Sequence, residues 1–150
     1  MASTAHQHND LNINDNIPGS IYFKWREVLW CPSWDVYVWP NKSQYYNLRL
    51  FIKKCDRVRG FLKKPMIVTS GLRPREYNKQ IKGARFSQHI KGNAIDFYVK
   101  GYEGIKRTSL IRNKLKYKLN EFGIRMEDID GDWIHIDGAE PGRTGRFFKP

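Results

Sequence analysis

The segment SQHIKGNAIDFYV, residues 87–99, carries a polar loop directly into a β-strand. Along that strand successive side chains fall on opposite faces, so residues 95, 97 and 99 form an apolar face and Asp96 lies on the other. A carboxylate in a mostly apolar strand is costly unless it is paired or bound to a metal. Gly92 permits a tight turn and Ala94 leaves space beside Asp96, so the loop can fold back and bring His89 and Asp96 together.

A further imidazole comes near the C-terminus, where His135 alternates with Ile134 and Ile136. The alternation predicts that the two isoleucines face the core, while His135 faces the other way with Trp133 and Asp137. Two histidines and one carboxylate are a recognised zinc set, and three protein ligands leave a fourth position for water or substrate. A lone histidine is more often a surface or core residue, so the hypothesis of a catalytic metal site depends on the combination.

Helical periodicity occurs in two long segments. Apolar residues recur at three- and four-residue intervals from residue 43 to an expected exit at Gly60, and again over residues 103–122 with a stop at Gly123. Pro74 is placed to begin a short helix.

Extended patterns cover residues 66–69, 93–99, 124–129 and 133–137. Asp130-Gly131 separates the last two, and this strong turn signal predicts an antiparallel hairpin. Because strands and helices do not alternate strictly, we expect an α+β fold, with a small antiparallel sheet and flanking helices packed to one side.

The chain has 150 residues, the length of one ordinary domain. We expect a flexible N-terminal arm over residues 1–18, with His6 and His8 as tail residues, and a single domain over residues 19–150. Four tryptophans lie within residues 21–39. They either pack in the core or form a carbohydrate-stacking surface, and large aromatics more often pack.

The net charge of +12 at neutral pH favours anionic partners such as nucleic acid, anionic lipid or an acidic cell-wall polymer. The alternative is a surface whose scattered charges serve only solubility. No recognition helix or aromatic RNA-binding motif is present, so no specific nucleic acid partner is expected.

Two cysteines, Cys31 and Cys55, exclude a disulfide-dense scaffold and leave either free thiols or a single bridge. The first 16 residues are polar and lack the apolar stretch of a secretory signal, and no run has transmembrane length. We therefore expect cytoplasmic synthesis without a signal peptide, with any work outside the cell requiring another export or release route.

Three segments together resemble a known family. Residues 87–96 fit the pattern Ser-x-His-x-x-Gly-x-Ala-x-Asp, Asp132-Trp133-Ile134-His135 fits acid-x-x-His, and Ser70-Gly71-Leu72-Arg73 fits Ser-Gly-x-Arg. This set is similar to that of the zinc D-Ala-D-Ala carboxypeptidases and L-alanyl-D-glutamate endopeptidases, hedgehog-like enzymes that include phage endolysins. The resemblance spans residues 66–137, and the basic tail at residues 142–150 carries no motif of the family.

The resemblance implies a site residue by residue. It implies one zinc ion held by His89, Asp96 and His135, with Asp132 as the general acid/base and Arg73 gripping the substrate. Strand alternation would point Asp132 away from His135 unless the strand begins only at about Trp133. Further roles, as support for the ligands or in contact with the substrate, are expected for Ser87, Gln88, Trp133 and Asp137.

The resemblance also implies an activity, the hydrolysis of peptide bonds in peptidoglycan stem peptides, as in a phage-type endolysin. The basic surface would then favour anionic cell-wall polymers. The alternative is a catalytically inactive zinc-binding module of the same fold that binds the cell wall or a particle. Nucleic-acid binding is a third hypothesis and depends on net charge alone.

Overall fold

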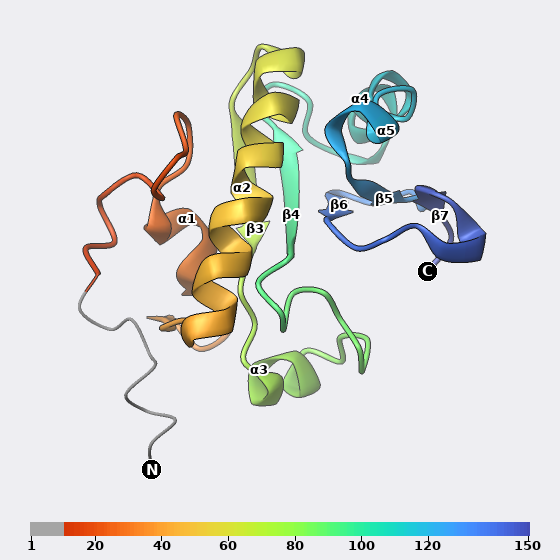
Figure 1. Ribbon diagram of the computed structural model, residues 1–150. Coiled ribbons are helices and arrows are strands. Elements are labelled where there is room, and N and C mark those ends of the chain that lie inside the picture. The colour runs from red at the N-terminus through yellow and green to blue at the C-terminus, as the bar shows by residue number, and fades with distance from the viewer. Residues whose placement is uncertain (1–10) are drawn as a thin grey trace.

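The computed structural model describes residues 11–150. In chain order the elements are α1 (Trp25–Leu29), β1 (Trp30–Cys31), β2 (Val36–Tyr37), α2 (Lys42–Leu62), β3 (Met66–Ser70), α3 (Arg75–Gln80), β4 (Ala94–Val99), α4 (Ile105–Leu115), α5 (Leu119–Phe122), β5 (Arg125–Glu127), β6 (Ile134–Asp137), a 3-10 turn (Gly142–Thr144) and β7 (Phe147–Phe148). Figure 1 labels these helices and strands where there is room and colours the chain from red near the N-terminus to blue at the C-terminus.

Five strands form the main sheet in the order β3-β4-β6-β5-β7. The first four are antiparallel, and β5 pairs with β7 in parallel. The expected α+β class is therefore confirmed, and the sheet is mixed instead of wholly antiparallel. The reason is topological: the chain turns back once after β6, so it re-enters the sheet beside β5 in the direction of β5.

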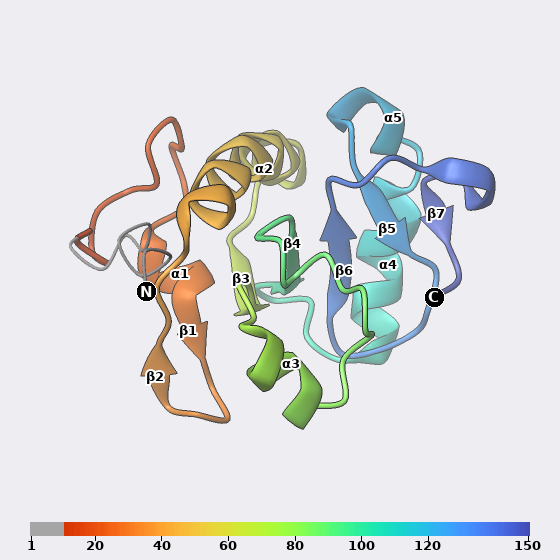
Figure 2. The same cartoon turned by 60° about the horizontal axis from the view of Figure 1, so that its bottom comes forward.

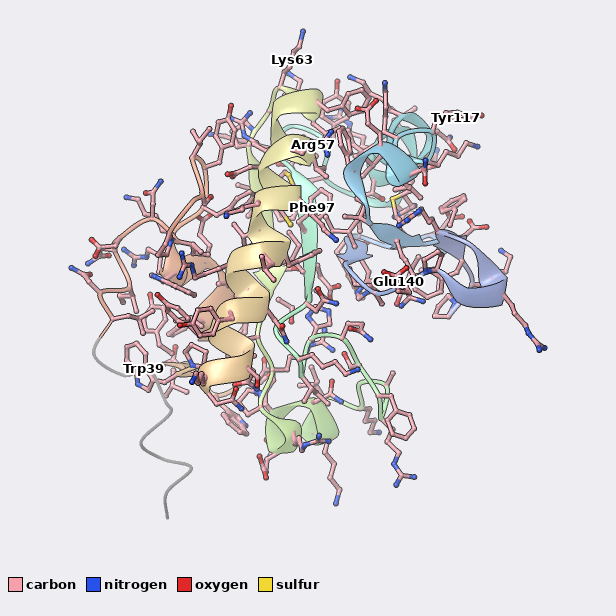
Figure 3. The ribbon with its side chains drawn as sticks, in the orientation of Figure 1. Trp39, Arg57, Lys63, Phe97, Tyr117 and Glu140 are labelled. Atoms are coloured by element: carbon pink, nitrogen blue, oxygen red, sulfur yellow. The ribbon has the colours of Figure 1, made fainter. Side chains whose placement is uncertain are left out.

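One face of the sheet forms the hydrophobic core. Its buried strand residues include Ile95, Phe97, Ile134 and Ile136, and they belong to one cluster with the apolar sides of α2, α4 and α5. Figure 2 shows α2 beside the β3–β4 half of the sheet and α4 beside the β6–β5 half. Phe97 is fully buried, whereas Tyr117, at the edge of the molecule in Figure 3, is exposed.

The helix α2 is longer than expected. Asn41 caps it, because its side chain accepts a hydrogen bond from the Gln44 amide and the Gln44 side chain accepts one from the Asn41 amide. Gly60 was expected to end the helix but lies inside it, and the left-handed residue that ends it is Lys63. The extra turn keeps Leu62 in the core, and this tertiary burial outweighs the low helix propensity of glycine.

The expected single helix over residues 103–122 is divided into α4 and α5. The break at residues 116–118 reorients the chain while Leu119 and Phe122 remain buried. The predicted stop at Gly123 is correct, and that residue has φ +67°.

The N-terminal segment is more ordered than expected. Residues 1–10 lie outside the described part of the chain, but Ile17 is fully buried and its amide donates to the Phe23 carbonyl. The expected arm is therefore wrong for residues 11–18, because apolar side chains among them pack against the core.

Three of the four tryptophans of residues 21–39 pack against other aromatic rings, and Trp39 packs against the core. Trp25 stacks on Tyr45, and Trp34 meets Tyr77 edge to face. Cys31 and Cys55 are both buried and free, which decides against a bridge between them. Within residues 11–150 no helix combines the length and the apolar character that a bilayer crossing requires.

Candidate metal centre

Two neighbouring strands place two of the three candidate ligands. In the β4–β6 ladder Asp96 lies directly opposite His135, and opposite residues of an antiparallel pair point to the same face. The loop before β4 adds His89 on that face, away from the core. The ligand atoms of the three residues all lie within 4.8 Å of one another. The structure therefore brings together the three side chains that the sequence predicted.

The loop bearing His89 is held at both ends. The His89 Nδ1–H donates to the Gly71 carbonyl over 2.8 Å, which leaves His89 Nε2 facing Asp96 Oδ1 at 3.1 Å. Gly71 packs so closely on α1 that a Cβ there would overlap the Val28 backbone. Gly92 has φ +73° and lies against the Gln44 backbone, so the tight turn expected at this glycine is present.

His135 is oriented by a carboxylate. Its Nε2–H donates to Asp137 Oδ2 over 2.8 Å, and its Nδ1 lies 3.0 Å from Asp96 Oδ1. Asp137 in turn accepts two hydrogen bonds from Arg125, at 2.8 and 2.9 Å. Asp137 was expected to support a ligand, and the structure places its carboxylate on the outer nitrogen of His135, the position from which a carboxylate fixes the ring and tautomer of a ligating histidine.

The two oxygens of Asp96 have different partners. Oδ1 faces both imidazoles, whereas Oδ2 accepts a hydrogen bond from Arg73 at 3.0 Å. The Arg73 guanidinium also donates to Ser70 and Asn78. Arg73 was expected to bind the substrate, and it lines the cleft. The three hydrogen bonds to Ser70, Asn78 and Asp96 hold its guanidinium beside the candidate ligand Asp96.

Burial and mutual contact shift the pKa of each group. Burial lowers the pKa of His89, although Asp96 opposes the effect. Burial also lowers the pKa of His135, but its bonds to Asp137 and Asp96 outweigh this and raise the pKa to about 9. For Asp96 burial favours the neutral form, yet the two imidazoles hold the pKa well below its usual range. The three groups thus form a coupled unit around an ionised carboxylate.

The donor set fits a zinc ion. Ligands about 2.1 Å from a tetrahedral zinc ion lie about 3.4 Å apart, and the two histidine-to-Asp96 distances are 3.1 and 3.0 Å. Both outer ring nitrogens are already engaged by Gly71 and Asp137, as is usual for metal-bound histidine. Small outward shifts of the rings would accommodate the ion.

A cleft of about 320 Å³ opens over these three side chains. It is also lined by Arg73, Ser87, Glu127 and Trp133, together with residues 81, 83 and 84. Trp133 is about half exposed, consistent with the expected role as a wall of the cleft. The cleft gives a substrate access to the candidate ligands from one side.

Two carboxylates other than Asp96 are candidates for proton transfer, and only one of them lines the cleft. β6 begins at Ile134, so Asp132 precedes the strand and strand alternation does not fix its direction. Its side chain is exposed, and it does not line the cleft. Glu127 does line it, and sequence reasoning missed this residue. The signal was available in Arg125-Met126-Glu127, where two charged residues flank an apolar one on a strand expected to pair with that of His135.

The remaining expected residues contribute to the loop. The Ser87 hydroxyl accepts a hydrogen bond from the His89 amide and lines the cleft. The Gln88 side chain accepts one from the Asn93 side chain. Gln88 therefore braces the ligand loop, which is one of the two contacts expected for it.

Comparison with known proteins found a family match and a similar solved structure. The family model described as Peptidase M15 matches residues 33–137. A solved structure, the L-Ala D-Glu endopeptidase ChiX of Serratia marcescens, aligns with 18% sequence identity over 63% of this chain and 85% of that chain, with a TM-score of 0.44. No curated protein sequence matches significantly. The family model covers well over half of the 150 residues, and the chain therefore belongs to the peptidase M15 family.

Proposed function

We propose that this protein is a zinc metallopeptidase that hydrolyses peptide bonds in peptidoglycan stem peptides. The observation that carries the proposal is the cluster of His89, Asp96 and His135, whose metal-facing atoms converge beneath an open cleft while their outer atoms are held by the protein. Membership of the peptidase M15 family supports the same reaction class.

In this proposal His89 Nε2, Asp96 Oδ1 and His135 Nδ1 hold the metal. Zinc bound there would polarise the scissile carbonyl and lower the pKa of water. A nearby carboxylate takes the proton of the attacking water and gives it to the leaving amine. We assign this proton transfer to Asp132 because of the acid-x-x-His spacing, and Glu127 is the second candidate because it lines the cleft.

Arg73 has a positioning role in this scheme. Its bond to Asp96 Oδ2 leaves Oδ1 as the oxygen that faces both imidazoles. The planar guanidinium meets Ser70, Asn78 and Asp96 at once, which a lysine ammonium on a flexible stem does not reproduce. Arg73 therefore keeps the carboxylate in the orientation that the site needs.

The bond that is cut is either D-Ala-D-Ala or L-Ala-D-Glu. We place the action at the cell wall, reached by release or by export through another protein, as in a phage-type endolysin. The net charge of +12 supports attraction to anionic wall polymers. The rival hypothesis, an inactive zinc-binding module of the same fold, is less favoured because the candidate metal ligands, a cleft over them and a further carboxylate in its lining, Glu127, are all present.

The test is digestion of purified peptidoglycan by the full chain, followed by mass spectrometry of the released fragments. We expect new termini at one of the two bonds, loss of activity on chelation and recovery with zinc. Asp132→Ala should retain zinc and lose cleavage. A wild-type protein that binds zinc stoichiometrically but releases no fragment would favour the inactive module.

A further inference from the structure

The C-terminal strand contacts the residues that support His135. Asp137 is almost fully buried, and both its oxygens accept hydrogen bonds from Arg125. Asp137 Oδ1 also accepts a bond from the Ala139 amide. With the 2.8 Å bond from His135 Nε2, the carboxylate is saturated, so the position of Arg125 determines where it can lie.

Phe148 covers the Arg125 guanidinium. The guanidinium carbon lies 4.1 Å from the centre of the Phe148 ring, a stacked cation–π contact. In the β5–β7 register Met126 pairs with Phe147 and Glu127 with Phe148. Phe147 packs against the hydrophobic core with Met126, whereas Phe148 lies on the same face as Arg125, Glu127 and the candidate metal ligands.

Hydrogen bonds join residues 146–148 to residues 124–128 along β5. The Met126 amide donates to the Arg146 carbonyl over 2.7 Å and the Asp128 amide to the Phe148 carbonyl over 2.6 Å. The Arg146 side chain donates to the Ile124 carbonyl. Phe148 is therefore held in register over Arg125 by backbone pairing on both sides of the contact.

The family match ends at residue 137, so this strand lies outside it. We propose that β7 is a support for the metal centre in which Phe148 confines Arg125, Arg125 holds Asp137, and Asp137 orients His135. Arg125 and Phe148 are thus positioning residues that act through the metal ligand without touching the substrate. The inference depends on the proposed function only in taking His135 as a ligand.

The experiment measures the zinc affinity of the full chain by competition with a chromophoric chelator, which needs no catalysis. Loss of a residue that orients a ligand typically lowers metal affinity about 10- to 100-fold. We expect Arg125→Gln to fall in this range and Phe148→Ala to lower affinity in the same direction by a smaller factor. Phe148→Tyr keeps the aromatic face and should bind zinc as the wild type does.

Lys149→Ala is the matched control, because Lys149 directly follows Phe148 and its ion pair with Asp128, at 3.3 Å, is exposed. It should leave zinc affinity unchanged. A second readout is the long-range ¹H–¹⁵N spectrum of the zinc-bound His135 ring, in which Arg125→Gln and Phe148→Ala should shift the Nε2 signal. If Phe148→Ala does not fold, Phe148→Leu replaces it, with the same expectation.

Wild-type zinc affinity and an unshifted His135 signal in folded Arg125→Gln and in folded Phe148→Ala, or in its replacement Phe148→Leu, would overturn the inference and leave β7 with a packing role alone. Failure of the part of the proposed function on which the inference depends, the role of His135 as a metal ligand, has a different signature. In that case the wild-type chain and His135→Ala would bind zinc equally weakly, whatever residue occupies position 148.

Discussion

Asp96 Oδ1 lies 3.0 Å from His135 Nδ1, although 39 residues separate the two in sequence. The contact follows from the β4–β6 register, which sets the two residues directly opposite each other. Two of the three candidate ligands are thus placed by backbone pairing in the centre of a sheet. The third, His89, reaches the site from a loop that is tied to Gly71 at the end of β3.

Zinc should stabilise the wild-type fold and not an Asp96→Ala variant. A ligand that binds only the folded state adds about 2.7 kcal/mol at a hundredfold excess over its Kd. We therefore expect a rise in Tm with zinc, measured by calorimetry, that chelator reverses. An equal rise in Asp96→Ala would place zinc elsewhere on the protein.

Asp132→Asn and Glu127→Gln should show which of the two candidate carboxylates transfers the proton. Removing a general acid/base typically lowers the rate about 10²- to 10⁴-fold. We expect this loss in kcat for Asp132→Asn, with zinc content unchanged, and a much smaller loss for Glu127→Gln. The reverse order of the two effects on a purified stem peptide would transfer the proton-transfer role to Glu127.

Arg73→Lys should weaken the site although it keeps the charge. Lysine does not reproduce the simultaneous bonds to Ser70, Asn78 and Asp96, and each buried polar group left unpaired costs about 1–3 kcal/mol. We expect a lower free energy of unfolding in urea and weaker zinc binding. Wild-type values in both measurements would show that the bond to Asp96 does not orient it.

Gly71→Ala and Gly60→Ala form a matched pair. A methyl group at position 71 meets the Val28 backbone, so the end of β3 must shift and move the carbonyl that holds His89. Overpacking of this kind costs about 1–3 kcal/mol. Position 60 has open space inside α2, where alanine is favoured over glycine by about 1 kcal/mol. Chemical denaturation should show opposite signs, and zinc affinity should fall only for Gly71→Ala.

Cys31 and Cys55 should resist alkylation in the folded protein. Burial raises the pKa of Cys31 from 9.0 to about 11 and that of Cys55 well above its usual value. At pH 8 the reactive thiolate fraction of Cys31 is then about a hundredfold lower than that of an ordinary thiol. Because folding raises the pKa of both thiols, the unfolded chain loses these protons at a lower pH than the folded chain. The contribution of the thiols to the free energy of unfolding is therefore complete below about pH 9 and is lost as the pH rises. Mass spectrometry after iodoacetamide should find both thiols unmodified until the chain is unfolded, and rapid native labelling of Cys31 would contradict this.

Much of the local structure was predictable because it depends on near neighbours. The alternation of residues 94–99, the stop at Gly123 and the helix that follows Pro74 all appear where local patterns indicate them. Predictions were wrong where distant packing decides. Gly60 lies inside α2 because the next turn reaches the core, and residues 11–18 are ordered because Ile17 is buried.

The sequence by itself determined the chemistry of the candidate site, because residue types and short spacings single out His89, Asp96 and His135 as donors. Only the tertiary structure decided how those donors are held. Asp137, Arg125 and Phe148 form a connected support, Arg73 faces Asp96, and Glu127 lines the cleft. The physical reason is that strand register and the parallel return of β7 depend on contacts between segments far apart in the chain, which no local pattern records.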